Sequence, residues 1–271
     1  KVNISLNIVG KLKSNHHKIE SIVTFLDIYD IIYVKVIKSD KHKIYFLGDF
    51  SKGIKSINTI SNLLKLLDRY KLLGQKFEIK IVKNIPQKSG MGGGSMNAAS
   101  LINFFLKKGL MNLNKKNLLK ICKTIGSDVA LGLENKNTIL KANGKLYRSK
   151  KKLNINVLIV KPNFGCSTKY IYSKVKYFSK SEYNRPSSKF LNFKNIINSN
   201  NQLEKVAIKQ YPALNSLKKT LIKLKDVAFV RMTGSGSTML AYFHSDYSVN
   251  SAYNKIKRKY KNYWCIKSKT I

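Results

Sequence analysis

Apolar and polar residues alternate at the start of the chain and again at several later places. Because successive side chains of a strand point to opposite faces, a period of two predicts strands. In the first half these strands are expected over 3–10, 31–37, 43–47 and 77–81. From Asn58 to Leu73 the apolar residues instead recur at three- and four-residue spacing, which predicts a helix that Gly74 ends. Two more helices are predicted over 95–110 and 115–125.

The cationic stretch 148–152 separates two halves of this pattern, so we place a domain boundary there and expect domains over 1–150 and 151–271. The second half predicts the order strand, helices, two strands, helix and strand. The predicted ranges are 154–161, 168–177, 202–224, 227–232, 238–243, 249–260 and a last strand near Trp264. This order predicts an α+β sandwich of the ferredoxin-like type.

The chain carries a formal net charge of +39, from 52 Lys and Arg against 13 Asp and Glu. Such a charge is typical of proteins that bind nucleic acids or membrane surfaces. However, 47 of the basic residues are Lys, and Lys, Ile and Asn, which have A/T-rich codons, make up 103 of the 271 residues. A nucleic-acid footprint is expected to contain clustered Arg, whereas these lysines are spread from end to end. We therefore favour genomic base composition as the origin of the charge and expect no specific nucleic-acid partner.

Apolar runs are too short for a membrane span, and the N-terminus has no signal-peptide pattern. The three cysteines are far apart, which fits a reducing compartment and gives no metal-ligand spacing. We expect a cytoplasmic protein without a membrane partner, in a bacterium or in an organelle matrix.

The segment 85–95 has the most specific chemistry in the sequence. It reads Ile-Pro-Gln-Lys-Ser-Gly-Met-Gly-Gly-Gly-Ser and joins a predicted strand to a predicted helix. Glycine lets a ligand approach the backbone, and the start of a helix offers unpaired amides and a positive dipole end. The segment is neither a Walker loop, which needs Gly-Lys-Ser/Thr, nor a Rossmann loop, because Ser95 stands where the last glycine should be. We predict a phosphate cradle.

Two other segments give weaker indications of a binding site. Gly234-Ser235-Gly236 lies between two predicted strands, where it is either an ordinary turn or a second oxyanion-binding loop. Asp128, in Gly126-Ser127-Asp128-Val129, precedes apolar residues. It is either a helix N-cap or a general base, and the sequence does not separate the two.

Together these segments resemble the GHMP-type small-molecule kinases, and the resemblance runs from Lys1 to the last strand. It is carried by the glycine loop, by Lys1-Val2-Asn3-Ile4-Ser5-Leu6, by Gly126-Ser127-Asp128-Val129, by Cys166-Ser167-Thr168 with Tyr172, and by Met232-Thr233-Gly234-Ser235-Gly236. The last four narrow it to members whose substrate is a cytidine diphosphate-linked methylerythritol. The implied fold has two domains, an N-terminal ribosomal-protein-like α/β domain and a C-terminal ferredoxin-like domain.

The resemblance also implies an activity and its residues. The activity is transfer of the γ-phosphoryl group of ATP to the 2-hydroxyl of the methylerythritol moiety, in non-mevalonate isoprenoid synthesis. Asp128 is the expected base and Lys1 its partner, and Asn3 would orient the acceptor. Phosphate and adenine contacts are expected from Asn58, Pro86, Ser89, Gly90, Gly92, Gly93, Gly94 and Ser95. Contacts with the cytidyl substrate are expected from His16, His17, Thr168, Tyr172, Gly234, Ser235 and Gly236.

The chain departs from the family pattern at several positions, among them Lys88, Met96, Ala130 and the expected cytosine segment. Where members usually have Asp-Gly-Tyr-His, this chain has Ser14-Asn15-His16-His17, so an imidazole stands in place of the aromatic ring that stacks on cytosine. The expected cofactors are ATP and Mg²⁺, as Mg-ATP, with no residue assigned as a metal ligand. We expect a monomer or a weak homodimer. A homoserine or mevalonate kinase-like enzyme remains the alternative, and a basic nucleic-acid-binding protein is a remote one.

Overall fold

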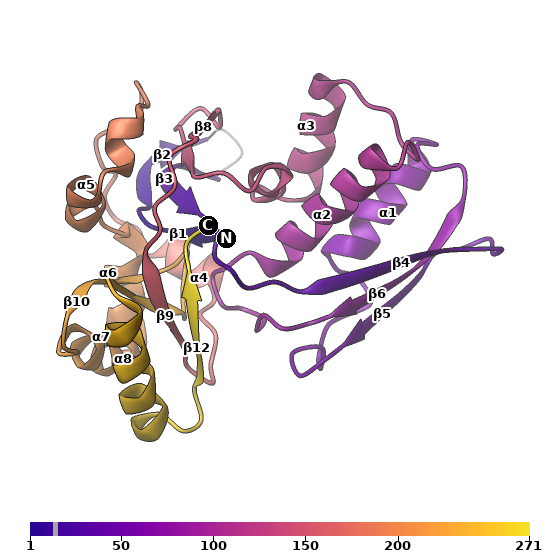
Figure 1. The fold of residues 1–271 in the computed structure, drawn as a ribbon. Helices are drawn as coiled ribbons and strands as arrows, with labels where there is room; N and C mark the ends of the chain where they lie inside the picture. Colours follow the sequence, from indigo (N-terminus) through magenta and orange to yellow (C-terminus); the bar gives the residue numbers. More distant parts are fainter. Residues whose placement is uncertain (13–15) are drawn as a thin grey trace. The chain divides into compact units, whose positions relative to one another are not determined.

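The computed structural model describes residues 1–12 and 16–271 and forms two compact units (Figure 1). Unit 1 contains residues 1–27, 88–91 and 136–271, and unit 2 contains residues 28–87 and 92–135. Ser14 and Asn15 of the expected cytosine segment lie outside the described residues. Packing therefore groups the first 27 residues with the second half of the chain. The expected domains 1–150 and 151–271 follow the chain rather than packing, and their boundary stays a prediction.

Unit 2 consists of a three-stranded sheet and helices that cover one of its faces. The strands are β4 (Ile31–Ile37), β5 (Lys43–Leu47) and β6 (Lys76–Val82), and central β6 pairs antiparallel with β4 and parallel with β5. The helices are α1 (Thr59–Arg69), α2 (Gly93–Lys107), α3 (Lys115–Ile125) and the 3₁₀-helix η1 (Val129–Leu133). Alternate β6 side chains, such as Phe77 and Ile79, are buried against Leu63 and Phe105 of the helices. The period-two and helical patterns of this region are confirmed.

The second half of unit 1 contains a four-stranded antiparallel sheet. Its strands are β9 (Asn156–Lys161), β10 (Val227–Met232), β11 (Met239–Phe243) and β12 (Trp264–Lys269), in the order β10-β11-β9-β12. One face packs on α6 (Gln202–Gln210), α7 (Pro212–Ile222) and α8 (Asp246–Lys259) in a single core. This strand order is that of a ferredoxin-like sandwich, so the predicted architecture of the second half is confirmed.

The first residues of unit 1 form part of a second sheet, and the hydrophobic pattern predicted only some of its strands. The expected strand over 3–10 is two strands, β1 (Val2–Asn3) and β2 (Asn7–Lys11), and both pair with β3 (His17–Thr24). The sheet continues through β7 (Thr138–Leu140) and β8 (Leu146–Arg148). The patterns did not predict β3, β7 or β8. Two are only three residues long, and β3 has no regular alternation, because its last five residues are all buried.

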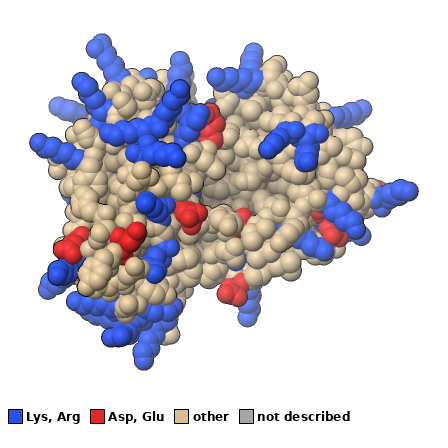
Figure 2. All heavy atoms as spheres, viewed as in Figure 1, with Lys and Arg blue, Asp and Glu red and all other residues tan. Residues whose placement is uncertain are grey.

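The remaining helices of unit 1 are short. They are α4 (Thr168–Ser173), α5 (Phe193–Asn198) and the 3₁₀-helix η2 (Ser188–Leu191). The expected helix over 168–177 therefore ends four residues early. In the described residues, no helix is long and apolar enough to cross a membrane. On the face that Figure 2 shows, Lys and Arg side chains form several groups, the densest at the upper and lower left, rather than one patch.

Candidate active site

The glycine loop joins β6 to α2, and Gly92 begins the helix. Gly92 occupies the N-cap position with φ 67°, a left-handed conformation that favours glycine. No side chain in the described part of the chain caps α2, and its first turn has no acidic residue. The amides of this turn are therefore open to an anion from solution, which the helix dipole would also favour. The local geometry fits the predicted phosphate cradle.

Two other predicted segments lie beside the start of α2. A Cβ atom added to Gly94 would be 3.1 Å from Oγ1 of Thr59, the first residue of α1. A Cβ atom added to Gly126 would be 3.6 Å from Oγ of Ser95. Unit 2 therefore brings together the start of α1, the start of α2 and the segment that leads to Asp128.

Asp128 occupies the N-cap position of η1 and is half-buried. Within the described residues its side chain makes no capping hydrogen bond, so the N-cap alternative loses its support. The carboxylate is on the segment next to Ser95 in the glycine loop, which is where a general base for phosphoryl transfer is needed. Its role as the base stays a prediction.

Asn58 has a structural role that the sequence did not indicate. Its Oδ1 accepts hydrogen bonds from the amides of Ile60 and Ser61, at 2.9 and 3.1 Å, and so caps α1. Ser61 Oγ accepts from the Asn58 amide at 2.9 Å, which completes a capping box. The expected contact between Asn58 and adenine stays a prediction. The capping hydrogen bonds already fix the position of this side chain.

In unit 1, Lys1 and Asn3 are linked to the second glycine segment. Lys1 Nζ donates to Asn3 Oδ1 at 3.0 Å. Asn3 is buried, with its side-chain amide donating to Ser21 Oγ at 2.7 Å and its backbone amide donating to Thr233 Oγ1 at 2.9 Å. These bonds fix the Asn3 side chain and place the Lys1 ammonium beside it.

Part of the first glycine loop packs tightly on the second. A Cβ atom added to Gly90 would lie 2.3 Å from the Thr233 carbonyl oxygen, and one added to Gly234 would lie 2.8 Å from the Gly90 carbonyl oxygen. Thr233 Oγ1 also donates to the Gly90 carbonyl at 3.4 Å. Only glycine fits at these positions, so the two glycine segments form one structure in unit 1. Ser89, also buried, accepts from the Met91 amide at 3.4 Å.

The residues expected to contact the cytidyl substrate also lie in unit 1. Thr168 Oγ1 and Ser235 Oγ are 2.8 Å apart, which joins the start of α4 to the second glycine segment. The rings of His17 and Tyr172 are 5.2 Å apart at 42°. His17 Nε2 is buried and has no hydrogen-bond partner among the described residues, whereas His16 is exposed. Burial, followed by the nearby charges of Lys11 and His16, lowers the pKa of His17 below its ordinary value.

The predicted residues thus form two sets. Unit 2 holds Asn58, Pro86, Gly92, Gly93, Gly94, Ser95 and Asp128, and unit 1 holds Lys1, Asn3, His16, His17, Thr168, Tyr172, Gly234, Ser235, Gly236, Ser89 and Gly90. The contacts described above link most members of each set within its own unit. Because Lys1 and Asp128 belong to different units, their pairing stays a prediction.

Sequence reasoning missed several residues that organise these sets. Ser21 and Thr233 fix Asn3, and Asp30 lies buried beside the first glycine loop with Lys83. Thr233 could have been noticed because it adjoins Gly234. The sequence gives no signal for Ser21 or Asp30, because their partners are distant along the chain.

Comparison with known proteins gives consistent results. Residues 58–135 match the family model "GHMP kinases N terminal domain", and residues 187–262 match "GHMP kinases C terminal". A 4-diphosphocytidyl-2-C-methyl-D-erythritol kinase of Pelagibacter ubique (strain HTCC1062) is 52% identical over 272 residues, which cover 100% of this chain and 96% of the relative. The kinase of the same name from Clostridium botulinum (strain Loch Maree / Type A3) is 31% identical, with 96% of this chain and 95% of that relative covered.

Solved structures share the fold. A crystal structure of 4-(cytidine 5'-diphospho)-2C-methyl-D-erythritol kinase has a TM-score of 0.78 at 20% identity, covering 99% of this chain and 96% of that chain. A homoserine kinase from Cytophaga hutchinsonii has a TM-score of 0.70 at 15% identity, covering 100% of this chain and 95% of that chain. At these identities the likeness concerns the fold alone.

Proposed function

The chain belongs to the 4-diphosphocytidyl-2-C-methyl-D-erythritol kinases, within the GHMP kinases, and from this premise we propose how it acts on its substrates. It is a small-molecule kinase that uses ATP as phosphoryl donor. Its acceptor is the 2-hydroxyl of 4-diphosphocytidyl-2-C-methyl-D-erythritol, and its product serves isoprenoid synthesis by the methylerythritol route. One observation supports this chemistry above the others. The uncapped start of α2 lies beside the segment that carries Asp128.

The start of α2 holds the phosphates of ATP in this proposal. The amides of Gly93, Gly94 and Ser95 face no capping side chain in the described residues, and a phosphate oxygen would accept from them. Phosphoryl transfer depends mainly on positioning and electrostatic stabilisation, so an ordered row of donors accounts for much of the catalysis. Asn58 and Pro86, on the same unit, lie on the adenine side.

Asp128 acts as the general base and Lys1 as its cationic partner. The Asp128 carboxylate accepts the proton of the 2-hydroxyl, whose oxygen forms a bond to the γ-phosphorus as the bond to the bridging oxygen of ADP breaks. The Lys1 ammonium favours the ionised carboxylate and reduces the negative charge that develops on the transferred group. Asn3, which bonds to Lys1 and is itself held by Ser21, orients the acceptor.

The cytidyl end of the substrate is held in unit 1. The tilted ring pair of His17 and Tyr172 supplies apolar faces for the base, and the buried Nε2 of His17 is a hydrogen-bonding atom without a described partner. Thr168 and Ser235 would bond the polar part of the substrate from the start of α4 and the second glycine segment.

Magnesium enters as Mg-ATP. In the described residues there is no group of three or more His, Cys, Asp and Glu side chains that could hold a metal ion. These residues fit an ion coordinated mainly by the substrate's phosphates, which is how Mg²⁺ is usually bound in kinases. When bound, it would neutralise phosphate charge. The proposal includes a cytoplasmic location, expected from the widely spaced cysteines, and a monomer or weak homodimer.

The test is an ADP-release assay with Mg-ATP and 4-diphosphocytidyl-2-C-methyl-D-erythritol. The intact chain is expected to release ADP, and Asp128→Asn to lower kcat by about 10²- to 10⁴-fold because it removes the base. Binding of a non-hydrolysable ATP analogue should be unchanged in that variant. Homoserine and mevalonate are the control acceptors. ADP release with either of them, or with no acceptor at all, would overturn the assignment.

A further inference from the structure

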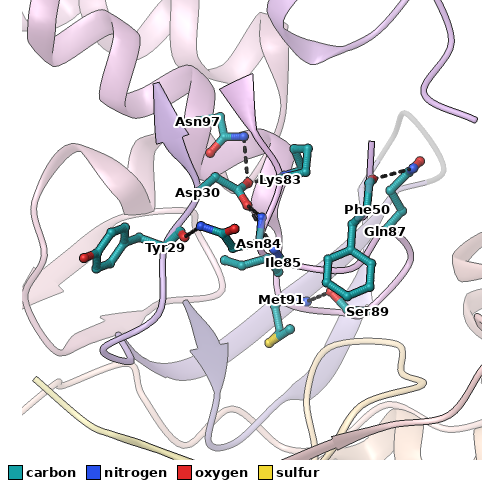
Figure 3. Close-up of polar contacts among 10 residues, drawn as sticks. All are labelled: Tyr29, Asp30, Phe50, Lys83, Asn84, Ile85, Gln87, Ser89, Met91 and Asn97. Atoms are coloured by element: carbon teal, nitrogen blue, oxygen red, sulfur yellow. Dashed lines mark hydrogen bonds and ion pairs between the residues drawn. The ribbon is translucent and has the colours of Figure 1, made fainter. Parts of the chain in front are cut away.

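A buried carboxylate that the proposed chemistry does not use lies beside the glycine loop (Figure 3). Asp30 precedes β4, and its side chain is 0% exposed. It pairs with the Lys83 ammonium, which is 6% exposed. A buried carboxylate is costly unless it is paired and hydrogen-bonded, so a structure that retains one must satisfy it fully.

Four hydrogen bonds satisfy this carboxylate. Oδ1 of Asp30 accepts from the backbone amides of Asn84 and Ile85, at 2.8 and 3.0 Å. Oδ2 accepts from Lys83 Nζ and, at 2.9 Å, from the side-chain amide of Asn97. All four donors and Asp30 itself lie in unit 2.

The donors come from both ends of the glycine loop. Lys83, Asn84 and Ile85 follow the end of β6 and form the stem through which the chain enters the loop. Asn97 lies in the second turn of α2, which is the stem through which the chain leaves it. One carboxylate therefore ties the entry stem to the exit stem and fixes the distance between them.

The tie lies directly against the phosphate-binding turn. A Cβ atom added to Gly93, the first residue of α2, would be 3.6 Å from Lys83 Nζ and 3.8 Å from Asp30 Oδ2. The first turn of α2, with its amides, is thus held by Asn97 on one side and by the β6 stem on the other. Amides held in place before the ligand arrives bind it with a smaller entropic cost.

We propose that Asp30 is a positioning residue for ATP, because its hydrogen bonds to both stems hold the first turn of α2 where the phosphates bind. This inference rests on the proposed function, in which that turn binds ATP. It predicts that loosening the tie weakens ATP binding selectively. The cytidyl substrate, whose expected contacts lie in unit 1, is unaffected.

Asn97→Ala is the main test variant, because it removes the exit-stem bond and leaves the Asp30–Lys83 ion pair intact. We expect the KM for ATP to rise about tenfold, the loss typical of a hydrogen bond to a charged group. The KM for the cytidyl substrate should stay within about twofold. The double variant Asp30→Asn, Lys83→Met removes both charges together, so no unpaired buried charge remains, and it should show the same selective rise.

Asp68→Asn is the matched control. Asp68 lies in α1 of the same unit, pairs with Lys76 at 2.8 Å and is also within 3.2 Å of His42, but none of these residues belongs to the glycine loop. This variant changes a more exposed Asp–Lys ion pair of the same unit and should leave the KM for ATP unchanged.

Binding of a non-hydrolysable ATP analogue, followed calorimetrically without any acceptor, separates this inference from the proposed function. Weaker analogue binding by Asn97→Ala than by the intact chain supports the tie whichever acceptor the enzyme uses. A lower Tm with unchanged analogue affinity and unchanged KM for ATP would show that Asp30 only stabilises the fold, and would overturn the inference. Equal rises in both KM values would also overturn it.

Discussion

At the level of single residues, the atoms that surround a glycine decide whether that position can accept a larger residue. Gly90 has φ 75°, and a Cβ atom there would lie 2.3 Å from a carbonyl oxygen of Thr233. Gly53 has a similar φ of 79°, yet a Cβ atom there would meet nothing within 4 Å. Two glycines with nearly the same φ thus differ in the space beside the α-carbon.

Gly90→Ala is expected to lower the free energy of unfolding by about 3 kcal/mol or more, since a backbone contact must be forced apart in addition to the strain. Gly53→Ala should cost only about 1–2 kcal/mol, the strain of a left-handed alanine. Urea denaturation of both variants and the intact chain measures the difference. Equal losses would mean that the contact between the two glycine segments contributes nothing.

At the scale of elements, the hydrogen bonds of one residue fix the start of α1. Asn58 Oδ1 caps the helix, and Asn58 Nδ2 donates to the carbonyls of Lys55 and Ser56 at 2.9 and 3.2 Å. A residue expected to contact adenine is therefore held rigidly by the helix that it begins. The family match starts at this same residue.

Asn58→Ala should destabilise the chain by about 1 kcal/mol, because α1 loses the acceptor for its first amides. Asn58→Ser keeps an acceptor at the cap and should recover most of that stability. If the Asn58 side chain also contacts adenine, both variants should have a higher KM for ATP. If Asn58 is purely structural, the KM for ATP should be unchanged in both variants. Thermal unfolding and ATP titration of the two variants separate these contributions.

At the scale of the whole molecule, the net charge of +39 comes mainly from lysines that are spread along the whole sequence. Lys and Arg occur across the face in Figure 2 without forming one patch, as expected from a composition bias toward Lys. Dispersed lysines attract polyanions only weakly and lose that attraction as salt screens it. Both substrates of the proposed reaction carry phosphates, and a general positive potential would speed their encounter with the enzyme.

We therefore expect nonspecific nucleic-acid binding only. At physiological salt, short RNA and DNA duplexes of unrelated sequence should bind the protein equally, with a Kd of about 10⁻⁴–10⁻⁶ M. This affinity should fall steeply as the salt concentration rises. Fluorescence anisotropy at several salt concentrations checks this. A nanomolar Kd for one sequence over others would contradict the compositional origin of the charge.

Secondary structure was predictable from the sequence wherever the residues that determine it lie within one short segment. The alternation in β6, the helical spacing in α1, and the glycines that precede α2 all depend on neighbours within a few residues. The same holds for the glycine turn that starts α2, because glycine conformation and a helix start are local properties. Its role as a phosphate cradle stays a prediction. Length and element order then predicted the ferredoxin-like half.

Tertiary structure alone decided the rest. The short strand β7 forms because β3, more than a hundred residues away in sequence, offers it hydrogen-bond partners, and the equally short β8 then pairs with β7. Packing likewise placed the first 27 residues in one unit with the second half of the chain. Asp30 has no local signal, since its partners at 83–85 and Asn97 reach it only after the sheet and α2 have assembled. Contacts between residues distant in sequence leave no periodic pattern in either segment, so the sequence determined the chemistry of the site and the folded chain determined what holds it in place.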